Sequence, residues 1–207
     1  RDGMLAFFNE AAMLNHLYRF ITLCETGGGF TFEPLKPVAF FPGTFDPIHY
    51  GHVDIAMRAA SLFDEVVVAV YDKPLKNLLF SPEQRINLVK EILKSESRIT
   101  VLGYSGLTVN FAREIGAKAI VRGLRVFSDF EFEFRMALAN NRLDADIDTI
   151  ALITTEENTF LSSSTVKEIA LLGGDVSTMV PPIVNRALVE YVKYQTTDTK
   201  PEINPTE

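Results

Sequence analysis

The sequence predicts an α/β fold in which five parallel strands form one doubly wound sheet. The first observation behind this prediction is an alternation, from Lys36 onward, of short apolar segments with segments of helical spacing. Such an alternation is typical of parallel strands joined by right-handed crossover helices. The second observation is that the apolar segments are continuous, the clearest being EVVVAVY at residues 65–71. Continuous β-branched runs indicate strands that are buried on both faces of a sheet.

The elements are expected in a regular order along the chain. We expect strands at residues 37–41, 65–71, 99–102, 118–121 and 149–153. We expect helices at residues 52–63, 81–94, 107–115, 130–142, 162–172 and 181–194. Ser81 is in position to cap the second helix, with Gln84 closing a capping box, and Pro82 suits its first turn. Gly173 and Gly174 are expected to end the fifth helix.

Three regions are expected along the chain. Residues 1–35 are interpreted as an N-terminal extension, helical or flexible, to which no role is assigned. Residues 36–195 form the folded domain, and residues 196–207 are expected to be a disordered, polar tail. Within the extension, Met4–Leu23 has the spacing of an amphipathic helix. A loosely docked appendage is the favoured interpretation and an oligomer contact the alternative, and truncation of a longer protein also stays open.

Composition and charge limit the class of protein. The formal net charge of the 207 residues is −7, which argues against a general nucleic-acid binder with a basic stripe. Anionic small ligands are not excluded, because helix N-termini and a few local cations can hold phosphates. The single cysteine, Cys24, allows no disulfide framework within the chain, so we expect a reducing, cytoplasmic environment. No membrane segment or signal peptide is expected, because polar residues interrupt the apolar stretch at Met4–Leu23.

The loop after the first strand reads PGTFDPIHYGH at residues 42–52. Ligands of doubly wound sheets bind beyond the carboxyl ends of the strands, so this loop and those after the other strands should share one cleft. Gly43 and Gly51 carry no side chain and would let the backbone approach a ligand closely. His49 and His52 are three residues apart at a helix start, where both can face one side and unpaired N–H groups attract anions. A phosphate-binding site is therefore expected here.

The stretch GTFDPIHYGH at residues 43–52 resembles the H-x-G-H signature of the nucleotidyltransferase superfamily. From about Lys36 to Tyr194, the chain is similar to the bacterial phosphopantetheine adenylyltransferase family. The resemblance implies a Rossmann-like nucleotidyltransferase fold and transfer of AMP from ATP to 4′-phosphopantetheine, giving dephospho-coenzyme A and pyrophosphate. It also implies a direct in-line displacement, catalysed mainly by positioning and electrostatics, with Mg²⁺ that enters together with ATP.

The loops after the other strands fit this resemblance. In RGLR at residues 122–125 each guanidinium can bind two phosphate oxygens, and a pair of salt-bridged surface arginines is the alternative. In DKPLKN at residues 72–77 the resemblance assigns Lys76 to the acceptor phosphate, and we interpret Lys73 as a surface residue. Three serines open the helix after the fifth strand, and a simple N-cap would account for one of them. They match the family pattern I-S-S-S-x-x-[KR] as LSSSTVK at residues 161–167.

The resemblance assigns a role to each predicted site residue. His52 is the catalytic residue, which would stabilise the transferring phosphate. Substrate binding is assigned to Thr44, Lys76, Thr108 and Arg122. ATP binding is assigned to Thr44, Phe45, His49, His52, Gly123, Leu124, Arg125, Glu133, Asn158, Thr159, Phe160, Leu161, Ser162, Ser163 and Ser164. No protein residue is assigned to a metal, and Asp129 and Glu131 are expected to pair with neighbouring arginines. Asn158 stands where many family members have tryptophan, a departure that bears on the adenine contact and not on the reaction.

Two other functions stay open at this point. One is another small-molecule nucleotidyltransferase, of nicotinate mononucleotide or glycerol phosphate type, and the other is a non-catalytic nucleotide sensor with the same fold. RGLR and Lys76 favour pantetheine, and the presence of both histidines favours an active enzyme. The resemblance also implies feedback binding by coenzyme A and a homo-oligomer, by family likeness a homohexamer. Neither a nucleic acid nor a membrane is expected as a partner.

Overall fold

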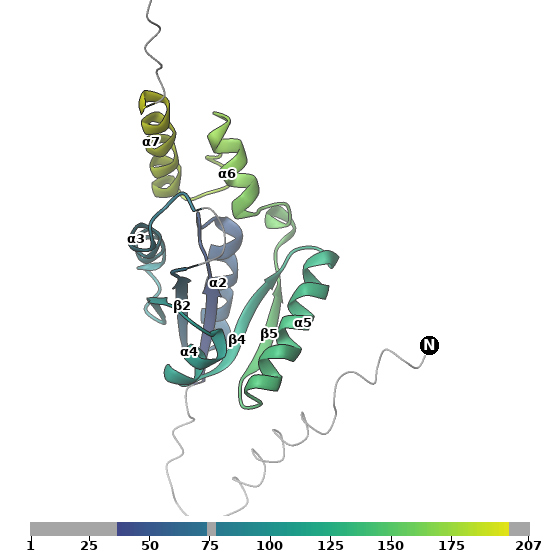
Figure 1. Ribbon diagram of the computed structural model, residues 1–207. Coiled ribbons are helices and arrows are strands. Elements are labelled where there is room, and N and C mark those ends of the chain that lie inside the picture. Colours follow the sequence, from purple (N-terminus) through teal and green to yellow (C-terminus); the bar gives the residue numbers. More distant parts are fainter. Residues whose placement is uncertain (1–36, 74–77, 199–207) are drawn as a thin grey trace, which may run out of the picture. The chain divides into compact units, whose positions relative to one another are not determined.

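The computed structural model describes residues 37–73 and 78–198, which form one sheet with helices beside it (Figure 1). The strands are β1 (Val38–Gly43), β2 (Glu65–Tyr71), β3 (Ile99–Tyr104), β4 (Ala117–Leu124) and β5 (Asp148–Ile153). The helices are α2 (Tyr50–Leu62), α3 (Pro82–Leu93), α4 (Thr108–Glu114), α5 (Phe127–Leu143), α6 (Ser163–Leu171) and α7 (Pro182–Asp198), with a 3₁₀ turn, η1, at Glu156–Asn158. The predicted extension at residues 1–35 lies outside the described residues, and so does the chain beyond Asp198.

All five strands are parallel and lie in the order β3-β2-β1-β4-β5, which confirms the predicted doubly wound α/β sheet. The chain proceeds outward from β1 to β3 and then returns to the other side of β1, so the strand order reverses between β1 and β4. β1 pairs with β2 from Val38 to Gly43, but with β4 only from Val38 to Phe40. The carboxyl ends of β1 and β4 therefore diverge, and the crevice at such a switch point is where these sheets bind ligands.

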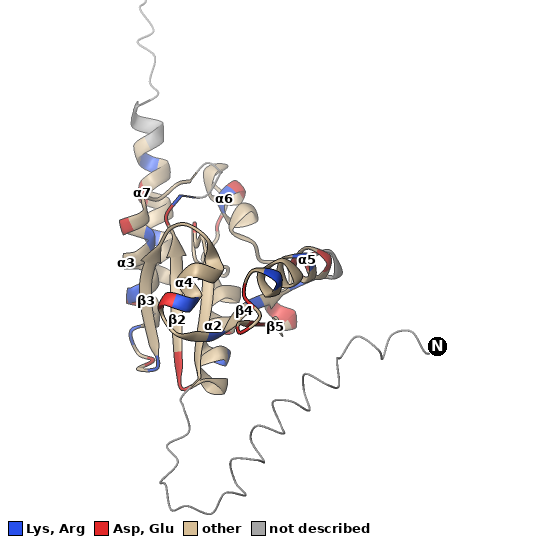
Figure 2. Cartoon of the chain, turned by 60° about the horizontal axis from the view of Figure 1, so that its bottom comes forward, with Lys and Arg blue, Asp and Glu red and all other residues tan. Residues whose placement is uncertain are grey.

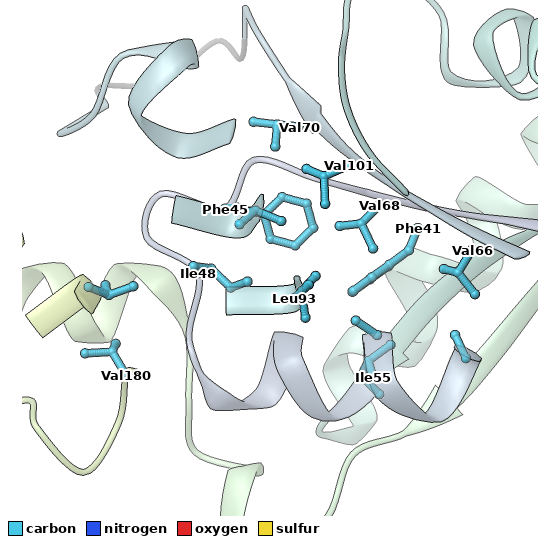
Figure 3. Close-up of a cluster of buried hydrophobic side chains, with 14 of the residues drawn as sticks. Phe41, Phe45, Ile48, Ile55, Val66, Val68, Val70, Leu93, Val101 and Val180 are labelled. Atoms are coloured by element: carbon cyan, nitrogen blue, oxygen red, sulfur yellow. The ribbon is translucent and has the colours of Figure 1, made fainter. Parts of the chain in front are cut away.

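Apolar side chains cover both faces of the sheet, as the continuous apolar strands predict. On one face, Phe41 of β1 packs in a cluster with Ile55 of α2 and Leu93 of α3, and Figure 3 shows this cluster between the strands and α2. On the other face, Phe40 contacts Phe111 of α4, with ring centroids 5.5 Å apart. α5 lies beside β4 and β5 (Figure 1). Because this packing covers the faces of the sheet, the edge formed by the carboxyl ends of the strands is left for a site.

The helix ends mostly follow the predicted signals. Ser81 caps α3, because its Oγ accepts from the Gln84 N–H at 3.2 Å while the Gln84 side chain accepts from the Ser81 N–H at 2.9 Å. α6 ends at Leu171, and Gly173 has a φ of +80°, a left-handed conformation that glycine adopts without strain. α7 opens at Pro182 as expected but extends to Asp198. Residues 196–198, predicted as part of a disordered tail, are thus helical.

Three element boundaries near the site differ from the sequence-based prediction. Arg122, Gly123 and Leu124 continue β4 and pair with residues 151–153 of β5, so most of RGLR is strand and not loop. α2 begins at Tyr50, two residues before the predicted start, and α5 begins at residue 127, three residues early. The reason is the same in each case. An apolar pattern marks only the turns and strand residues that face the core, whereas these ends border the site.

Charged residues are interspersed, with lysines and arginines among acidic residues on the helices and at strand ends (Figure 2). No helix in the described ranges is long and apolar enough to cross a bilayer. Among the described residues, two charged ones are almost wholly enclosed, Asp46 at 1% exposure and Arg85 at 0%. Asp46 follows β1 and Arg85 lies in the first turn of α3. Both are therefore near the edge of the sheet at which the site is expected.

Candidate active site

Two adjoining cavities open at the crevice between the carboxyl ends of β1 and β4. The first has a volume of about 330 Å³ and the second a volume of about 470 Å³. They share one wall, which is made of Pro42, Gly43, Thr44, Arg122 and Glu133. Segments that are far apart in the sequence thus meet at one edge of the sheet, as predicted. They form two compartments, however, and not a single cleft.

The first cavity is lined mainly by polar and charged groups. Besides the shared wall, its lining consists of Phe41, Phe45, His49, Gly51, His52, Ile55, Gly123, Arg125, Asp129, Thr154, Ser162, Ser163 and Ser164. These residues come from the ends of β1, β4 and β5 and from the starts of α2, α5 and α6. Three helix N-termini therefore border this cavity. Their N–H groups lack partners within the helix and their dipoles favour negative charge, so the cavity is suited to phosphate oxygens.

The two histidines of the H-x-G-H stretch stack on each other, with ring centroids 3.7 Å apart and ring planes inclined by 25°. The His49 N–H donates to Nδ1 of His52 at 3.3 Å. Because a neutral imidazole carries one proton, acceptance at Nδ1 leaves that proton on Nε2, which is then a donor. Phe45 contacts the His52 ring edge-on, with centroids 5.0 Å apart. These contacts fix the orientation of the imidazole at the cavity wall.

His49 is neutral at physiological pH. Its side chain is only 4% exposed, and its Nδ1 has no hydrogen-bond partner within the described residues. Burial, together with the positive charge of Arg125, lowers the pKa of His49 from the ordinary 6.5 to about 4. The histidine stack therefore forms without a positive charge on His49. His49 can therefore offer a ligand a neutral ring nitrogen for a hydrogen bond, but not a positive charge.

The glycines of the first loop make room for aromatic rings. A Cβ atom at position 43 would lie 2.7 Å from the Phe45 ring, and one at position 51 would lie 3.1 Å from the His49 ring. Real Cβ atoms do not approach other atoms as closely as the first of these distances, so a side chain at Gly43 would displace Phe45. The sequence-based explanation, close approach of the backbone to a ligand, misses this packing. Gly43 and Gly51 are needed first to seat the rings that hold His52.

Arg122 lies in the shared wall and is held by three hydrogen bonds. Its Nε and Nη2 donate to the two carboxylate oxygens of Glu133, each at 2.7 Å, and its Nη1 donates to the Pro42 carbonyl at 3.1 Å. The last bond joins the diverging ends of β1 and β4. A guanidinium has more N–H donors than these bonds use. One N–H on Nη1 and one on Nη2 remain as donors, and guanidinium N–H groups can bind two oxygens of a phosphate.

Arg125 connects the end of β4 to the chain before α6. Its Nε and Nη2 donate to Asp129 at 2.9 and 3.2 Å, and its Nη1 donates to the Leu161 carbonyl at 2.7 Å. The expected pairing of Asp129 with a neighbouring arginine is thus confirmed. Glu131 lies 3.8 Å from Arg135, also as expected. These bonds use one N–H on each guanidinium nitrogen, as in Arg122, so Arg125 keeps one N–H on Nη1 and one on Nη2 for a ligand, in addition to its charge.

The three serines at the start of α6 have different contacts. The Ser162 Oγ accepts from the Thr165 N–H at 3.0 Å and so caps the helix. The Ser163 Oγ donates to the Pro47 carbonyl at 2.9 Å, which ties α6 to the loop before α2. Ser164 borders the first cavity. Capping accounts for one serine, as the sequence predicts, and a contact between two loops of the site accounts for the second.

The second cavity is lined mainly by apolar and aromatic groups. Besides the shared wall, its lining consists of Tyr71, Tyr104, Gly106, Leu107, Thr108, Ile120, Phe132, Met136, Ala137, Asn140 and Thr149. Thr108, a predicted substrate contact, opens α4, and its Oγ1 lies 3.5 Å from the Tyr104 hydroxyl. Asn140 is 8% exposed, and the buried Thr149 Oγ1 has no partner within the described residues. The cavity therefore suits an extended, mostly neutral ligand with a few polar groups.

Some predicted site residues do not border a cavity. Lys76 lies outside the described residues. The following predicted ATP contacts line neither cavity: Leu124, Asn158, Thr159, Phe160 and Leu161. The side chains of Asn158 and Thr159 bond to Thr155 of the same turn, and Leu161 is buried in the core at 2% exposure. This segment reaches the site through its main chain, since the Leu161 carbonyl accepts from Arg125.

The sequence patterns miss two buried charged residues beneath the site, Asp46 and Arg85. Asp46 accepts from the Leu79 N–H at 3.0 Å and from Lys167 Nζ at 3.1 Å, which ties the loop after β1 to α6. No local pattern identifies either residue as buried. Thr154, by contrast, lines the first cavity directly after β5, and its position at a strand end is a signal that could have identified it.

Comparison with known proteins assigns this site to a family. A family model described as cytidylyltransferase-like matches residues 40–169. A phosphopantetheine adenylyltransferase from Desulfitobacterium hafniense (strain Y51) is 51% identical over 157 residues, which are 76% of this chain and 95% of the relative. A second one, from Thermotoga neapolitana, is 50% identical over 156 residues, or 75% of this chain and 97% of the relative. This chain belongs to the phosphopantetheine adenylyltransferase family.

A more distant crystal structure agrees with the fold of this phosphopantetheine adenylyltransferase family member. It is a protein from Vibrio parahaemolyticus assigned as a nicotinate-nucleotide adenylyltransferase, with a TM-score of 0.57 and 22% sequence identity. The match covers 75% of this chain and 99% of that protein. At this level of identity the likeness concerns the fold alone, and it confirms the predicted Rossmann-like nucleotidyltransferase architecture.

Proposed function

We propose that this chain binds ATP in the first cavity and 4′-phosphopantetheine in the second, and that it transfers AMP from one to the other. The observation behind the proposal is the shared wall, where a polar cavity and an apolar cavity meet at Thr44 and Arg122. ATP carries a triphosphate, which requires N–H donors and cations. 4′-Phosphopantetheine carries one phosphate on a long neutral arm, which requires a cation at one end and apolar walls along the rest. Both phosphates meet if each ligand has its phosphate end at the shared wall.

In the proposed reaction, an oxygen of the acceptor phosphate attacks the α-phosphorus of ATP. The new bond forms in line with the bond to the bridging oxygen of the β-phosphate, and that bond breaks as pyrophosphate leaves with the electron pair. The products are dephospho-coenzyme A and pyrophosphate. Such a displacement requires no protein nucleophile. The chain has to position two anions and stabilise the charge that develops on the transferring phosphate.

The polar groups of the site have distinct parts in this proposal. The Nε2–H of His52 donates to the transferring phosphate. The two remaining N–H groups of Arg122 hold the acceptor phosphate, with Lys76 as a second cation, and Thr44 contacts both substrates. Glu133, which the family resemblance assigns to ATP, acts in addition through Arg122, because its carboxylate fixes the direction in which that guanidinium faces.

The proposal includes Mg²⁺ bound together with ATP. In residues 37–73 and 78–198, no three His, Cys, Asp or Glu side chains are grouped so as to hold a metal ion. The two carboxylates that line the first cavity, those of Asp129 and Glu133, are each bonded to an arginine. The donor set that fits Mg²⁺ here is therefore phosphate oxygens and water, which is a usual environment for this ion. When bound, it neutralises phosphate charge.

Pyrophosphate release from ATP tests the proposal. The assay is run with 4′-phosphopantetheine, with nicotinate mononucleotide, with glycerol phosphate and with no acceptor. We expect release that depends on 4′-phosphopantetheine. Release that depends instead on another acceptor would identify another small-molecule nucleotidyltransferase. ATP binding with no release for any acceptor would identify a nucleotide sensor, and either result would contradict the proposal.

The family resemblance also leads us to propose a closed homo-oligomer that acts in the cytoplasm and binds coenzyme A as a feedback ligand. α5 supports the oligomer, because Phe132, Leu138 and Leu143 are 55%, 57% and 54% exposed. Apolar side chains that gather on one exposed element are a usual feature of subunit contacts. Light scattering of the purified chain gives the number of subunits, and a monomer would contradict this part of the proposal.

A further inference from the structure

Arg85 is the bulkiest of the fully buried side chains in the described part of the chain, with 0% exposure. It lies in the first turn of α3, and its guanidinium donates to main-chain carbonyls of the surrounding loops. Nε donates to Phe80 at 3.2 Å, and Nη2 donates to Asp72 at 3.3 Å. Nη1 donates to both Thr44, at 2.7 Å, and Tyr71, at 2.8 Å. A single nitrogen thus joins the chain after β1 to the end of β2.

This double contact begins where the sheet ends. The ladder between β1 and β2 has its last pair at Gly43 and Val70, so Thr44 and Tyr71 are the next residues on each side. Without Arg85, no ladder bond would hold these two carbonyl groups at a fixed separation. Thr44 belongs to the wall shared by the two cavities, and Tyr71 lines the second cavity. Arg85 itself lines neither cavity, so it acts on the site through the main chain.

We propose that Arg85 is a positioning residue for adenylyl transfer. By holding Thr44 and Tyr71 through one nitrogen, it fixes the shared wall relative to the second cavity and aligns the acceptor phosphate with the α-phosphorus of ATP. The inference rests on the proposed function, because it concerns the same two substrates. It extends that function to a residue that touches neither of them.

The chemistry of the guanidinium explains why arginine is required here. A lysine ammonium keeps the charge but has one nitrogen in place of three, so it can approach Thr44 and Tyr71 only by leaving the Phe80 and Asp72 carbonyls without a donor, and nothing then fixes its own position. Methionine is of similar length and leaves the carbonyls without a donor, which is costly for buried groups. In either variant Thr44 and Tyr71 can move apart. A displacement of about 1 Å in a positioning group can lower a rate by roughly a hundredfold.

Two variants and one matched control test the proposal. Arg85→Lys and Arg85→Met change the positioning group, and Val89→Ala changes a completely buried residue one turn further along α3. Val89→Ala loosens the packing of α3 without removing a bond to Thr44 or Tyr71. For each protein, the melting temperature is measured first. The kcat and both KM values are then measured in the pyrophosphate assay, at a temperature at which every variant is folded.

We expect kcat to fall about a hundredfold in Arg85→Met and about tenfold in Arg85→Lys, the range given by small displacements of positioning groups. The KM for 4′-phosphopantetheine rises more than the KM for ATP, because Tyr71 lines the second cavity alone whereas Thr44 borders both. Val89→Ala lowers the melting temperature and leaves kcat close to that of the unaltered chain. If Arg85→Met does not fold, Arg85→Lys decides the outcome.

Two results would overturn the positioning role alone. One is an unchanged kcat in Arg85→Lys, and the other is a loss of kcat in Val89→Ala in proportion to its loss of melting temperature. Both leave pyrophosphate release by the unaltered chain intact. The absence of any release by the unaltered chain with 4′-phosphopantetheine is a different result. It would overturn the proposed function, and the role of Arg85 with it.

Discussion

The two cavities of the site differ in chemistry although they share a wall. The first is bordered by helix N-termini, histidines and arginines, whereas the second is bordered by aromatic and aliphatic side chains. In the first, each arginine is oriented by a carboxylate, Arg122 by Glu133 and Arg125 by Asp129. In the second, orientation comes from ring packing, such as that of Tyr104 in β3. The first cavity is thus suited to the charged groups of a ligand, and the second to an extended and mostly apolar part of a ligand.

This difference indicates what a change in each part of the site should do. A change in the polar cavity should alter turnover or the charge state of the protein. A change in the shared wall should alter the affinity for the acceptor, because the acceptor phosphate lies there in the proposed complex.

His52→Ala is expected to give the largest effect, on kcat. Loss of the Nε2–H donor should lower kcat by about two to three orders of magnitude, the usual cost of removing one donor to a developing oxyanion. The fold should survive, because the change is confined to the start of α2. Pyrophosphate release measures the rate and circular dichroism measures the fold. Near-normal turnover would discard the catalytic role of His52.

A second variant separates catalysis from helix capping at the same position. In His52→Asn, the side-chain oxygen can accept the His49 N–H in place of Nδ1, but the imidazole donor is lost. We expect His52→Asn to have the melting temperature of the unaltered chain and a kcat as low as that of His52→Ala. Recovery of kcat together with stability would mean that His52 acts only by forming the start of the helix.

The polar cavity should also respond to pH through His49. Its pKa is about 4 in the folded protein and near 6.5 when unfolded, so the unfolded chain binds more protons as the pH falls. The contribution of His49 to stability is therefore complete above pH 6.5 and is lost as the pH falls toward 4. A shift of this size corresponds to about 3 kcal/mol in the free energy of unfolding.

Denaturant unfolding between pH 7 and pH 4, on the unaltered chain and on His49→Gln, measures this contribution. Only the difference between the two pH profiles is used, because the carboxylates titrate in both proteins. We expect the unaltered chain to lose stability faster below pH 6.5. Parallel profiles would show that His49 is not held neutral, and the first cavity would then carry more positive charge than its burial indicates.

Most of the fold could be predicted from the sequence, because its signals are local. The run at residues 65–71 and the capping box at Ser81 each depend on neighbouring residues and are found as predicted. The end of β4 was not predictable in this way. Arg122 continues the strand because residues of β5 lie beside it. This ladder partner follows nearly thirty residues later in the sequence, so the residues around Arg122 contain no local signal for it.

The positions of the residues at the strand ends were predictable, whereas most of the long-range contacts that hold them were not. Thr44, His52 and Arg122 meet because strand ends of a parallel sheet share one edge, which follows from topology. Arg85, in contrast, looks like any solvent-facing arginine of an amphipathic helix. Its burial depends on the Thr44 carbonyl, 41 residues away in the sequence, and on other main-chain groups that no side-chain pattern represents.

Arg122→Ala tests the division between the cavities most directly, although its expected effect is the smallest. The guanidinium is expected to hold the acceptor phosphate with charge-assisted hydrogen bonds, whose loss corresponds to about a tenfold or somewhat larger rise in KM for 4′-phosphopantetheine. The KM for ATP should change little. A rise in the KM for ATP alone would mean that the two cavities are assigned to the wrong substrates.

The same substitution leaves Glu133, whose side chain is 14% exposed, without its cation, and an unpaired carboxylate in the shared wall would repel a phosphate. The double variant Arg122→Ala/Glu133→Gln removes this repulsion. If the KM for 4′-phosphopantetheine stays high in the double variant, Arg122 binds the acceptor phosphate directly. If it returns to that of the unaltered chain, Arg122 serves only to neutralise Glu133, and the acceptor phosphate must be held by other groups of the wall.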